Sequence, residues 1–109
     1  MVITENGIAT AKDIKRVRYL FNHMLEVKEA MQDGADVRGY FVWTLVDNYE
    51  WHHGSKVPFG LSKFDRASKM RLFRPSALFY RGIIDSSRDA TIMSDVSTAP
   101  ELPPGFVER

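Results

Sequence analysis

The sequence predicts an α/β protein in which two parallel strands are joined by a helix. A short run of apolar and β-branched residues, Met1–Thr4, has the character of a strand. From Ile14 to Met31 apolar residues recur every three or four positions, the spacing of one face of an amphipathic helix. A second apolar run follows at Val37–Leu45. A strand, a helix and a strand in this order indicate a βαβ crossover and a parallel sheet.

The first strand is expected to lead into a polar turn at Glu5-Asn6-Gly7, because asparagine and glycine favour turns. Lysine and glutamate separate the apolar residues of the helix, which are Ile14, Val17, Leu20, Phe21, Met24, Val27 and Met31. Thr10 or Asp13 can cap the start of this helix by accepting backbone N–H groups. Gly34 can take the left-handed conformation that closes its end.

The second strand is rich in aromatic and β-branched residues, and it is nearly continuous in apolar character from Tyr40. This composition is typical of a strand buried in a parallel sheet, whose two faces both need cover. The following segment, Asp47–Gly60, mixes glycine, proline and asparagine with large aromatic side chains. We expect a loop that does more than connect two elements.

The rest of the chain is predicted to be a hairpin, a helix and a tail. Leu61–Phe64 and Lys69–Phe73 are the two arms of the hairpin. Pro75 suits the first turn of a helix, where its missing N–H costs nothing, and an apolar stripe continues toward Asp85. Residues 1–85 are therefore expected to form the folded portion, and residues 86–109 an extended C-terminal tail.

Composition argues against several classes of function. The chain has 15 basic and 14 acidic residues, so no nucleic-acid partner is expected. The 44% of hydrophobic residues includes no run long enough to span a membrane, so no membrane partner is expected. Absence of cysteine excludes disulfides and thiolate metal sites. With no signal peptide at Met1 a cytoplasmic location is expected, although a longer protein would place the true N-terminus upstream.

A few residues carry candidate chemistry. Trp43 and Trp51 can stack on the apolar face of a sugar while the indole N–H binds a hydroxyl, although core packing is the commoner role for Trp43. Glu50 lies between two aromatic residues, where a carboxylate must be paired, hydrogen-bonded or functional. A glutamate such as Glu5, before Asn-Gly, is usually a solvated turn residue. His52 has a histidine neighbour, but no third strong ligand accompanies the pair, so no metal site is expected.

Four segments resemble the C-terminal end of family-1 glycoside hydrolases, in the right order. Ile3–Gly7 contains the Thr-Glu-Asn-Gly motif, and Asp36–Trp51 resembles the family's eighth strand and sugar-binding loop almost residue for residue. Phe59–Leu61 and Arg74–Arg81 continue the match. The last of these is most similar to the archaeal, thermophilic branch, and the resemblance covers roughly Val2–Asp85.

The resemblance implies a partial (β/α)8 TIM barrel consisting of strand seven, helix seven, strand eight and helix eight. It implies a retaining β-glycosidase of β-linked glucosides or galactosides, with Glu5 as the catalytic nucleophile and no cofactor. Trp43 would lie beneath the sugar ring, Glu50 would bind the 4- and 6-hydroxyls, and Trp51 would bind the 3-hydroxyl. Phe59 would lie beside the 6-position. The sequence departs from the family at Pro58, where an arginine usually stands.

Such an enzyme needs a second carboxyl group, and the resemblance implies that it comes from an Asn-Glu-Pro segment after strand four. No such tripeptide occurs here. We therefore expect the 109-residue chain to be inactive alone. An alternative is a non-catalytic carbohydrate-binding or interaction remnant. A third hypothesis is a poorly folded piece without function of its own, which self-associates through the exposed edge of an incomplete barrel.

Overall fold

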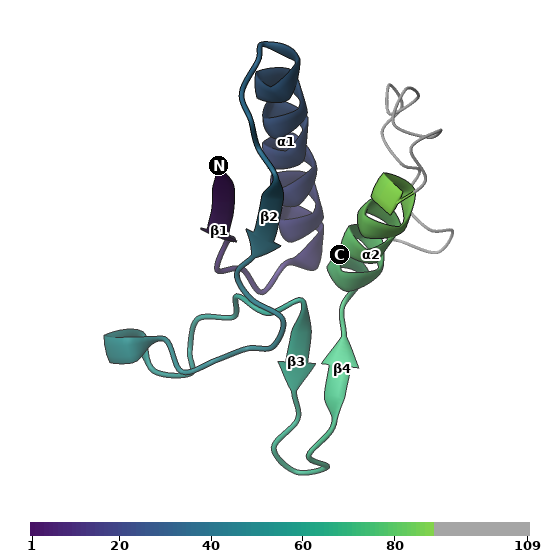
Figure 1. The fold of residues 1–109 in the computed structure, drawn as a ribbon. Coiled ribbons are helices and arrows are strands. Elements are labelled where there is room, and N and C mark those ends of the chain that lie inside the picture. Colours follow the sequence, from purple (N-terminus) through teal and green to yellow (C-terminus); the bar gives the residue numbers. More distant parts are fainter. Residues whose placement is uncertain (89–109) are drawn as a thin grey trace.

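A computed structural model describes residues 1–88 of the chain, and its first three elements form the predicted βαβ unit (Figure 1). Strand β1 (Val2–Asn6) is followed by helix α1 (Asp13–Gln32) and strand β2 (Gly39–Val42). The two strands are parallel, with Val2 opposite Gly39 and a shift in register before Asn6. The predicted α/β class with a parallel pair of strands is confirmed.

The ends of α1 differ in part from the expectation. Lys12 is the residue before the helix, and its side chain forms no capping hydrogen bond. The Thr10 hydroxyl accepts the Lys12 N–H at 3.1 Å, outside the helix, and Asp13 turns toward another helix, so neither residue caps α1 as predicted. At the other end Gly34 has φ of +99° and donates to the Met31 carbonyl at 3.1 Å, as predicted for its left-handed conformation.

Both strands end at different residues from those predicted. β1 continues through Glu5 and Asn6, because the Asn6 carbonyl still accepts the Trp43 N–H at 2.9 Å, so the turn predicted at Glu5 begins later. β2 ends at Val42 and not at Leu45, because the Trp43 N–H makes the last backbone hydrogen bond to β1. Beyond this point the backbone pairs with residues 59–62, and the Ser62 N–H donates to the Leu45 carbonyl at 2.9 Å.

The segment between β2 and the hairpin is a loop, as predicted, with one short 3₁₀ helix at Trp51–His53. Strands β3 (Ser62–Phe64) and β4 (Arg71–Phe73) form the predicted antiparallel hairpin. Helix α2 (Pro75–Arg88) packs beside α1, begins at the proline and continues past the boundary expected at Asp85. The remainder of the predicted tail, residues 89–109, lies outside the described residues.

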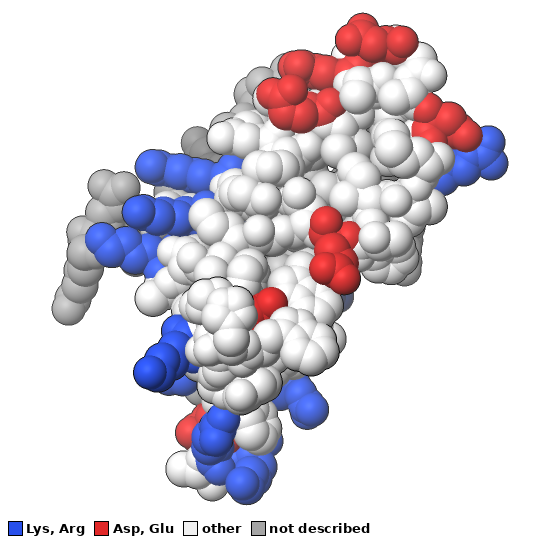
Figure 2. Space-filling view, turned by 90° about the vertical axis from the view of Figure 1, so that its left-hand side faces the viewer, with Lys and Arg blue, Asp and Glu red and all other residues white. Residues whose placement is uncertain are grey.

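The buried apolar core is small and lies between α1, β2 and the segment before β3; it consists of Val17, Leu20, Val37 and Leu61. Other large apolar side chains remain exposed, including Val2 at 49% and Phe41 at 60%. Figure 2 shows a broad surface of mostly uncharged residues, interrupted by acidic side chains, on the side of the molecule that carries β1. Within residues 1–88 this part of the parallel sheet is therefore left largely uncovered.

Candidate functional site

The site is built at the edge where β1 and β2 end. Because the strands are parallel, their carboxyl ends meet at one edge, which brings the strand that carries Glu5 beside the residue after β2, Trp43. The Trp43 N–H donates to the Asn6 carbonyl at 2.9 Å. Gly7 lies so close that an added Cβ would be 1.8 Å from the Trp43 carbonyl oxygen. The Glu5 side chain is exposed and forms no hydrogen bond with the described residues.

Trp43 and Glu50 are brought together. The indole N–H of Trp43 donates to the Glu50 carboxylate at 3.4 Å, and the Asn48 amide donates to the same oxygen at 2.9 Å. Glu50 is thus hydrogen-bonded, one of the three states expected for a carboxylate among aromatic residues. Sequence analysis left Asn48 out of the site. Its buried Oδ1 has no hydrogen-bond partner among the described residues, so this amide retains an unused acceptor.

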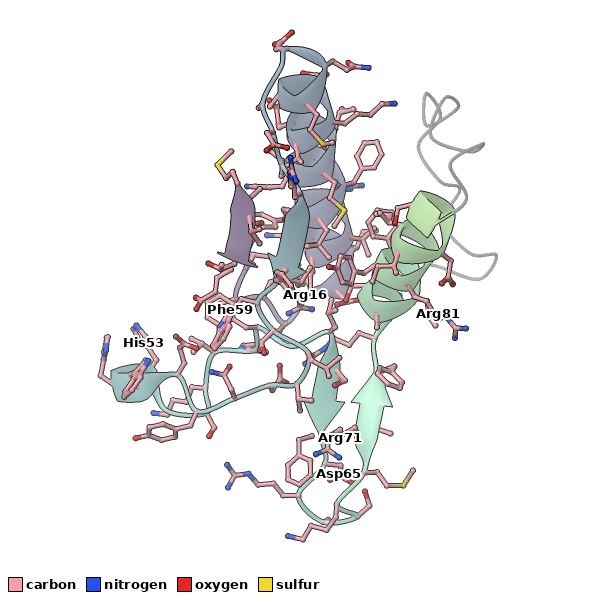
Figure 3. All side chains as sticks on the ribbon, viewed as in Figure 1. Arg16, His53, Phe59, Asp65, Arg71 and Arg81 are labelled. Carbon is pink, nitrogen blue, oxygen red and sulfur yellow. The ribbon has the colours of Figure 1, made fainter. Side chains whose placement is uncertain are left out.

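Trp51 stands apart from this pair. It lies in the 3₁₀ helix of the loop with 80% of its surface exposed, and its indole forms no hydrogen bond or ring contact with another described residue. Neighbouring His52 and His53 contact each other with ring centroids 3.8 Å apart. Figure 3 shows His53 pointing outward at the far end of the loop. No group of ligands able to hold a metal ion occurs within residues 1–88.

Phe59 is half-buried, and Figure 3 places its ring near the ends of β1 and β2. The residue before it is anchored by Arg16, whose side chain is only 1% exposed. One Arg16 nitrogen, Nη2, donates at 2.7 Å to the carbonyls of both Thr10 and Pro58. The Thr10 N–H also donates to the Pro58 carbonyl, at 3.0 Å. Proline at position 58 therefore still takes part in two hydrogen bonds through its carbonyl.

The charge of Arg16 is paired with Asp13 on the same turn of α1. Asp13 also accepts the Ser76 N–H and the Ser76 hydroxyl, each at 2.8 Å. A carboxylate at this position caps the first turn of α2 and complements the helix dipole there. Asp13 consequently joins α1, α2 and, through Arg16, the loop that carries Phe59.

Gly60, the residue after Phe59, is held by Asp47, which is itself paired with Arg74. The Asp47 carboxylate accepts the Gly60 N–H at 2.8 Å and receives both terminal nitrogens of Arg74, at 3.0 and 2.8 Å. Burial raises the pKa of Asp47, but hydrogen bonds from Arg74 and Gly60, and the nearby guanidinium charges, outweigh it and lower the pKa below its usual value. Asp47 thus stays ionised while it holds the loop.

Sequence reasoning missed these anchors for identifiable reasons. Arg16 follows the helical pattern as one polar residue among many, and such residues usually face solvent. Asp47 lies in a loop, where a carboxylate commonly bonds nearby backbone, and no local pattern indicates that it also pairs with Arg74. Arg74 lies in a segment that carries the family resemblance, and this was the available signal that it mattered.

Two tyrosine hydroxyls form hydrogen bonds with the parallel strand pair. The Tyr40 hydroxyl donates to the Asn6 side-chain oxygen at 2.6 Å, and the Tyr80 hydroxyl donates to the Tyr40 carbonyl at 2.9 Å. Burial, with smaller contributions from Tyr19 and Tyr80, raises the pKa of Tyr40 to about 12. Burial also raises the pKa of Tyr80. Both hydroxyls therefore remain proton donors at neutral and mildly alkaline pH.

Comparison with known sequences shows relatives along nearly the whole chain. The family model described as Glycosyl hydrolase family 1 matches residues 1–89. A β-galactosidase of Saccharolobus solfataricus is 43% identical over 104 residues, 95% of this chain and 21% of the relative. A β-galactosidase of Sulfolobus acidocaldarius is 41% identical over the same share. The predicted similarity to archaeal proteins is confirmed, and the chain spans about a fifth of their length.

Solved structures give the same result. A β-glucosidase from Thermotoga maritima superposes with a TM-score of 0.73 at 33% identity, covering 77% of this chain and 21% of that one. A mutant of a hyperthermophilic β-glucosidase is 54% identical with a TM-score of 0.69, covering 72% of this chain and 17% of that one. None of the helices within residues 1–88 combines the length and apolar character needed to cross a membrane.

Proposed function

The chain belongs to glycosyl hydrolase family 1, and on this premise we propose that it is the C-terminal, nucleophile-bearing portion of a retaining β-glycosidase. In this proposal β1, α1, β2 and α2 are strand seven, helix seven, strand eight and helix eight of a (β/α)8 barrel. The barrel portion expected over residues 1–85 extends to the end of α2 at Arg88, and the C-terminal tail follows it. The names of the relatives, β-galactosidase and β-glucosidase, support β-linked galactosides and glucosides as substrates.

One observation carries the proposal: Glu5 and Trp43 lie at the carboxyl edge of two adjacent parallel strands. In (β/α)8 barrels the catalytic residues lie at this edge of the strands. An exposed carboxylate there is free to meet a ligand. The Trp43 indole is held by Glu50, so that its orientation is defined before a sugar arrives.

The chemistry follows from two carboxyl groups about 5 to 5.5 Å apart. Glu5 attacks the anomeric carbon as the bond to the leaving oxygen breaks, and a second carboxylic acid protonates that oxygen. Water then hydrolyses the glycosyl ester on Glu5, with the second group now acting as base. Glu50 is a poor candidate for this second role, because its carboxylate accepts hydrogen bonds from Trp43 and Asn48. The acid/base glutamate therefore belongs to a part of the barrel outside these 109 residues.

The sugar is assigned to the surface around Trp43. Its ring would stack beneath the pyranose, and Glu50 would bind the 4- and 6-hydroxyls while keeping its bond to Asn48. Phe59 would border the 6-position, anchored on both sides by Arg16 and Asp47. Trp51 would bind the 3-hydroxyl. Because two carboxylates carry every proton transfer and the covalent step, the reaction needs no metal or organic cofactor. The cytoplasmic location stays a prediction.

A chimaera tests the proposal directly. The chain would replace the matching last fifth of the S. solfataricus β-galactosidase, and hydrolysis of an aryl β-glucoside would be measured. We expect activity in the chimaera and none in the 109-residue chain alone. Glu5→Gln should abolish it, whereas Glu26→Gln, an exposed glutamate on α1, should leave it unchanged. An active chimaera that survives Glu5→Gln, or an isolated chain whose turnover depends on Glu5, would contradict the proposal.

A second candidate function is carbohydrate binding without catalysis, favoured by the Trp43–Glu50–Asn48 cluster that this chain forms by itself. Titration with cellobiose, followed by tryptophan fluorescence, distinguishes the two. A saturable response that Glu50→Gln removes and Glu26→Gln retains would support this function.

The exposed sheet also predicts self-association. Both strands of the parallel pair have an unpaired edge within the described residues, and Val2 and Phe41 are exposed. We expect oligomers in size-exclusion chromatography. A sharp monomer peak together with a cooperative thermal melt would count against this expectation.

A further inference from the structure

The dipeptide Asn6-Gly7 combines a reactive sequence with an unusual restraint. Glycine after asparagine leaves the following backbone nitrogen unshielded, because no side chain covers it. That nitrogen can attack the asparagine Cγ, forming a five-membered succinimide and releasing the side-chain nitrogen as ammonia. Water then opens the ring to aspartate or isoaspartate. Overall, one water is consumed and one ammonia leaves, with no oxidant or cofactor.

The structure restrains both groups that must meet. The Asn6 side-chain oxygen accepts the Tyr40 hydroxyl at 2.6 Å, and the Asn6 carbonyl accepts the Trp43 N–H at 2.9 Å. Gly7 is packed so tightly that an added Cβ would lie 1.8 Å from the Trp43 carbonyl oxygen and 2.9 Å from its carbon. The side chain, the carbonyl and the following residue are thus all fixed against β2 or the residue after it.

Ring closure requires rotation of the Asn6 side chain and of its Cα–C bond away from the extended strand conformation. The first rotation breaks the bond to Tyr40, and the second disturbs the bond to Trp43. The same hydrogen bond from Tyr40 also has an effect that favours deamidation, because it stabilises the negative charge that develops on the Asn6 side-chain oxygen as the Gly7 nitrogen attacks. The restraint should dominate, since attack cannot begin until the side chain has left the position that Tyr40 enforces. We propose that the Tyr40 hydroxyl protects Asn6 from deamidation, and that Asn6 is a site of spontaneous modification once this hydrogen bond is lost.

The position gives the modification a consequence, which rests on the proposed role of Glu5. Deamidation would place a second carboxylate next to the nucleophile, and a nearby like charge raises the pKa of a carboxyl group. Isoaspartate would also insert a methylene into the backbone between Glu5 and Gly7. Either product would replace the amide that Tyr40 binds.

The same structure supplies a matched control. Tyr80 is also a half-buried tyrosine, and its hydroxyl donates to the Tyr40 carbonyl, not to Asn6. Tyr80→Phe therefore removes one buried hydroxyl from the same cluster and leaves the Asn6 side chain bound. Because the pKa of Tyr40 is about 12, its hydroxyl remains protonated in the mildly alkaline buffers that accelerate deamidation.

The test follows deamidation in the 109-residue chain by peptide mapping and mass spectrometry, with isoaspartate detected separately. Wild type, Tyr40→Phe and Tyr80→Phe would be incubated in warm, mildly alkaline buffer, and the same chains in urea give the unprotected rate. We expect Tyr40→Phe to convert Asn6 about three to ten times faster than wild type, the factor that one net hydrogen bond supplies. Tyr80→Phe should match wild type, and Asn22, exposed on α1, serves as an internal reference.

Two results would overturn the proposal. One is a Tyr40→Phe chain that converts Asn6 no faster than wild type. The other needs no variant: if the folded wild type deamidates as fast as the chain in urea, no protection exists, even if Tyr40→Phe fails to fold. Because the experiment measures peptide mass and not the hydrolysis of a glycoside, either outcome is independent of the glycosidase assignment.

Discussion

Replacement of Arg16 by methionine tests how the loop that carries Phe59 is held. Methionine keeps much of the length and removes the charge and all donors. Arg16 is 1% exposed, is paired with Asp13, and donates to the carbonyls of Thr10 and Pro58. Removing one partner of a buried ion pair costs about 3–5 kcal/mol, because the other charge is left uncompensated. Two features reduce the loss: Asp13 keeps its bonds to Ser76, and the Arg16 Nε has no partner in the native state.

We therefore expect the lower end, about 3 kcal/mol, which for a domain of this size corresponds to a fall in Tm of more than about 10 °C. Urea unfolding measures the free energy, and Arg38→Met is the control. Arg38 also pairs with an aspartate, Asp36, but their side chains are 76% and 68% exposed. An exposed pair contributes about 0–1 kcal/mol. The reasoning fails if Arg16→Met and Arg38→Met lose the same stability.

Three further outcomes are expected. Folding lowers the pKa of Asp47, so the stability that its ionised form supplies is present above the ordinary aspartate pKa of about 3.9 and is lost as pH falls through the lower folded value. Asp47→Asn should therefore flatten this part of a Tm-against-pH curve. An unchanged curve would show that the bond to Arg74 is unimportant for stability. Gly60→Ala should lower the free energy of unfolding by more than about 2 kcal/mol, since its Cβ would lie 2.3 Å from the Asp47 backbone nitrogen. Gly34→Ala should lower it by about 1 kcal/mol, because Gly34 has φ of +99° but its Cβ would meet open space. Equal losses in urea unfolding would contradict this expectation. Trp51 is 80% exposed and Trp43 is partly shielded, so Trp51→Phe should shift tryptophan emission to shorter wavelength and reduce quenching by iodide. A shift to longer wavelength would mean that Trp43, and not Trp51, is the more exposed tryptophan.

The elements with strong periodicity were predictable from sequence. The apolar stripe of α1, the glycine that closes it at Gly34 and the proline that opens α2 each act through local physics, namely side-chain spacing and backbone dihedrals. Strand bounds were less predictable. β2 ends at Val42 although the apolar run continues to Leu45, because pairing with β1 ends near Asn6 and the backbone that follows bonds to residues 59–62 instead.

The candidate site divides in the same way. Glu5, Trp43 and Glu50 were named from residue type, order and family resemblance, and the contact between Trp43 and Glu50 agrees with that grouping. The catalytic role of Glu5 and the sugar contacts of Trp43, Glu50, Trp51 and Phe59 stay predictions. Asn48 as a partner of Glu50 was not foreseen, because a polar residue in a loop has many local alternatives.

Sequence by itself determined the chemistry that this chain can offer: one carboxylate and one indole at the ends of two predicted strands, without cysteine or an Asn-Glu-Pro segment. Tertiary structure alone decided how these groups are held. Arg16 binds Pro58 across 42 residues, and Asp13 binds Ser76 across 63. No periodicity encodes such pairs, because periodicity records which face of an element is apolar, whereas a buried ion pair depends on which elements meet once the chain has folded.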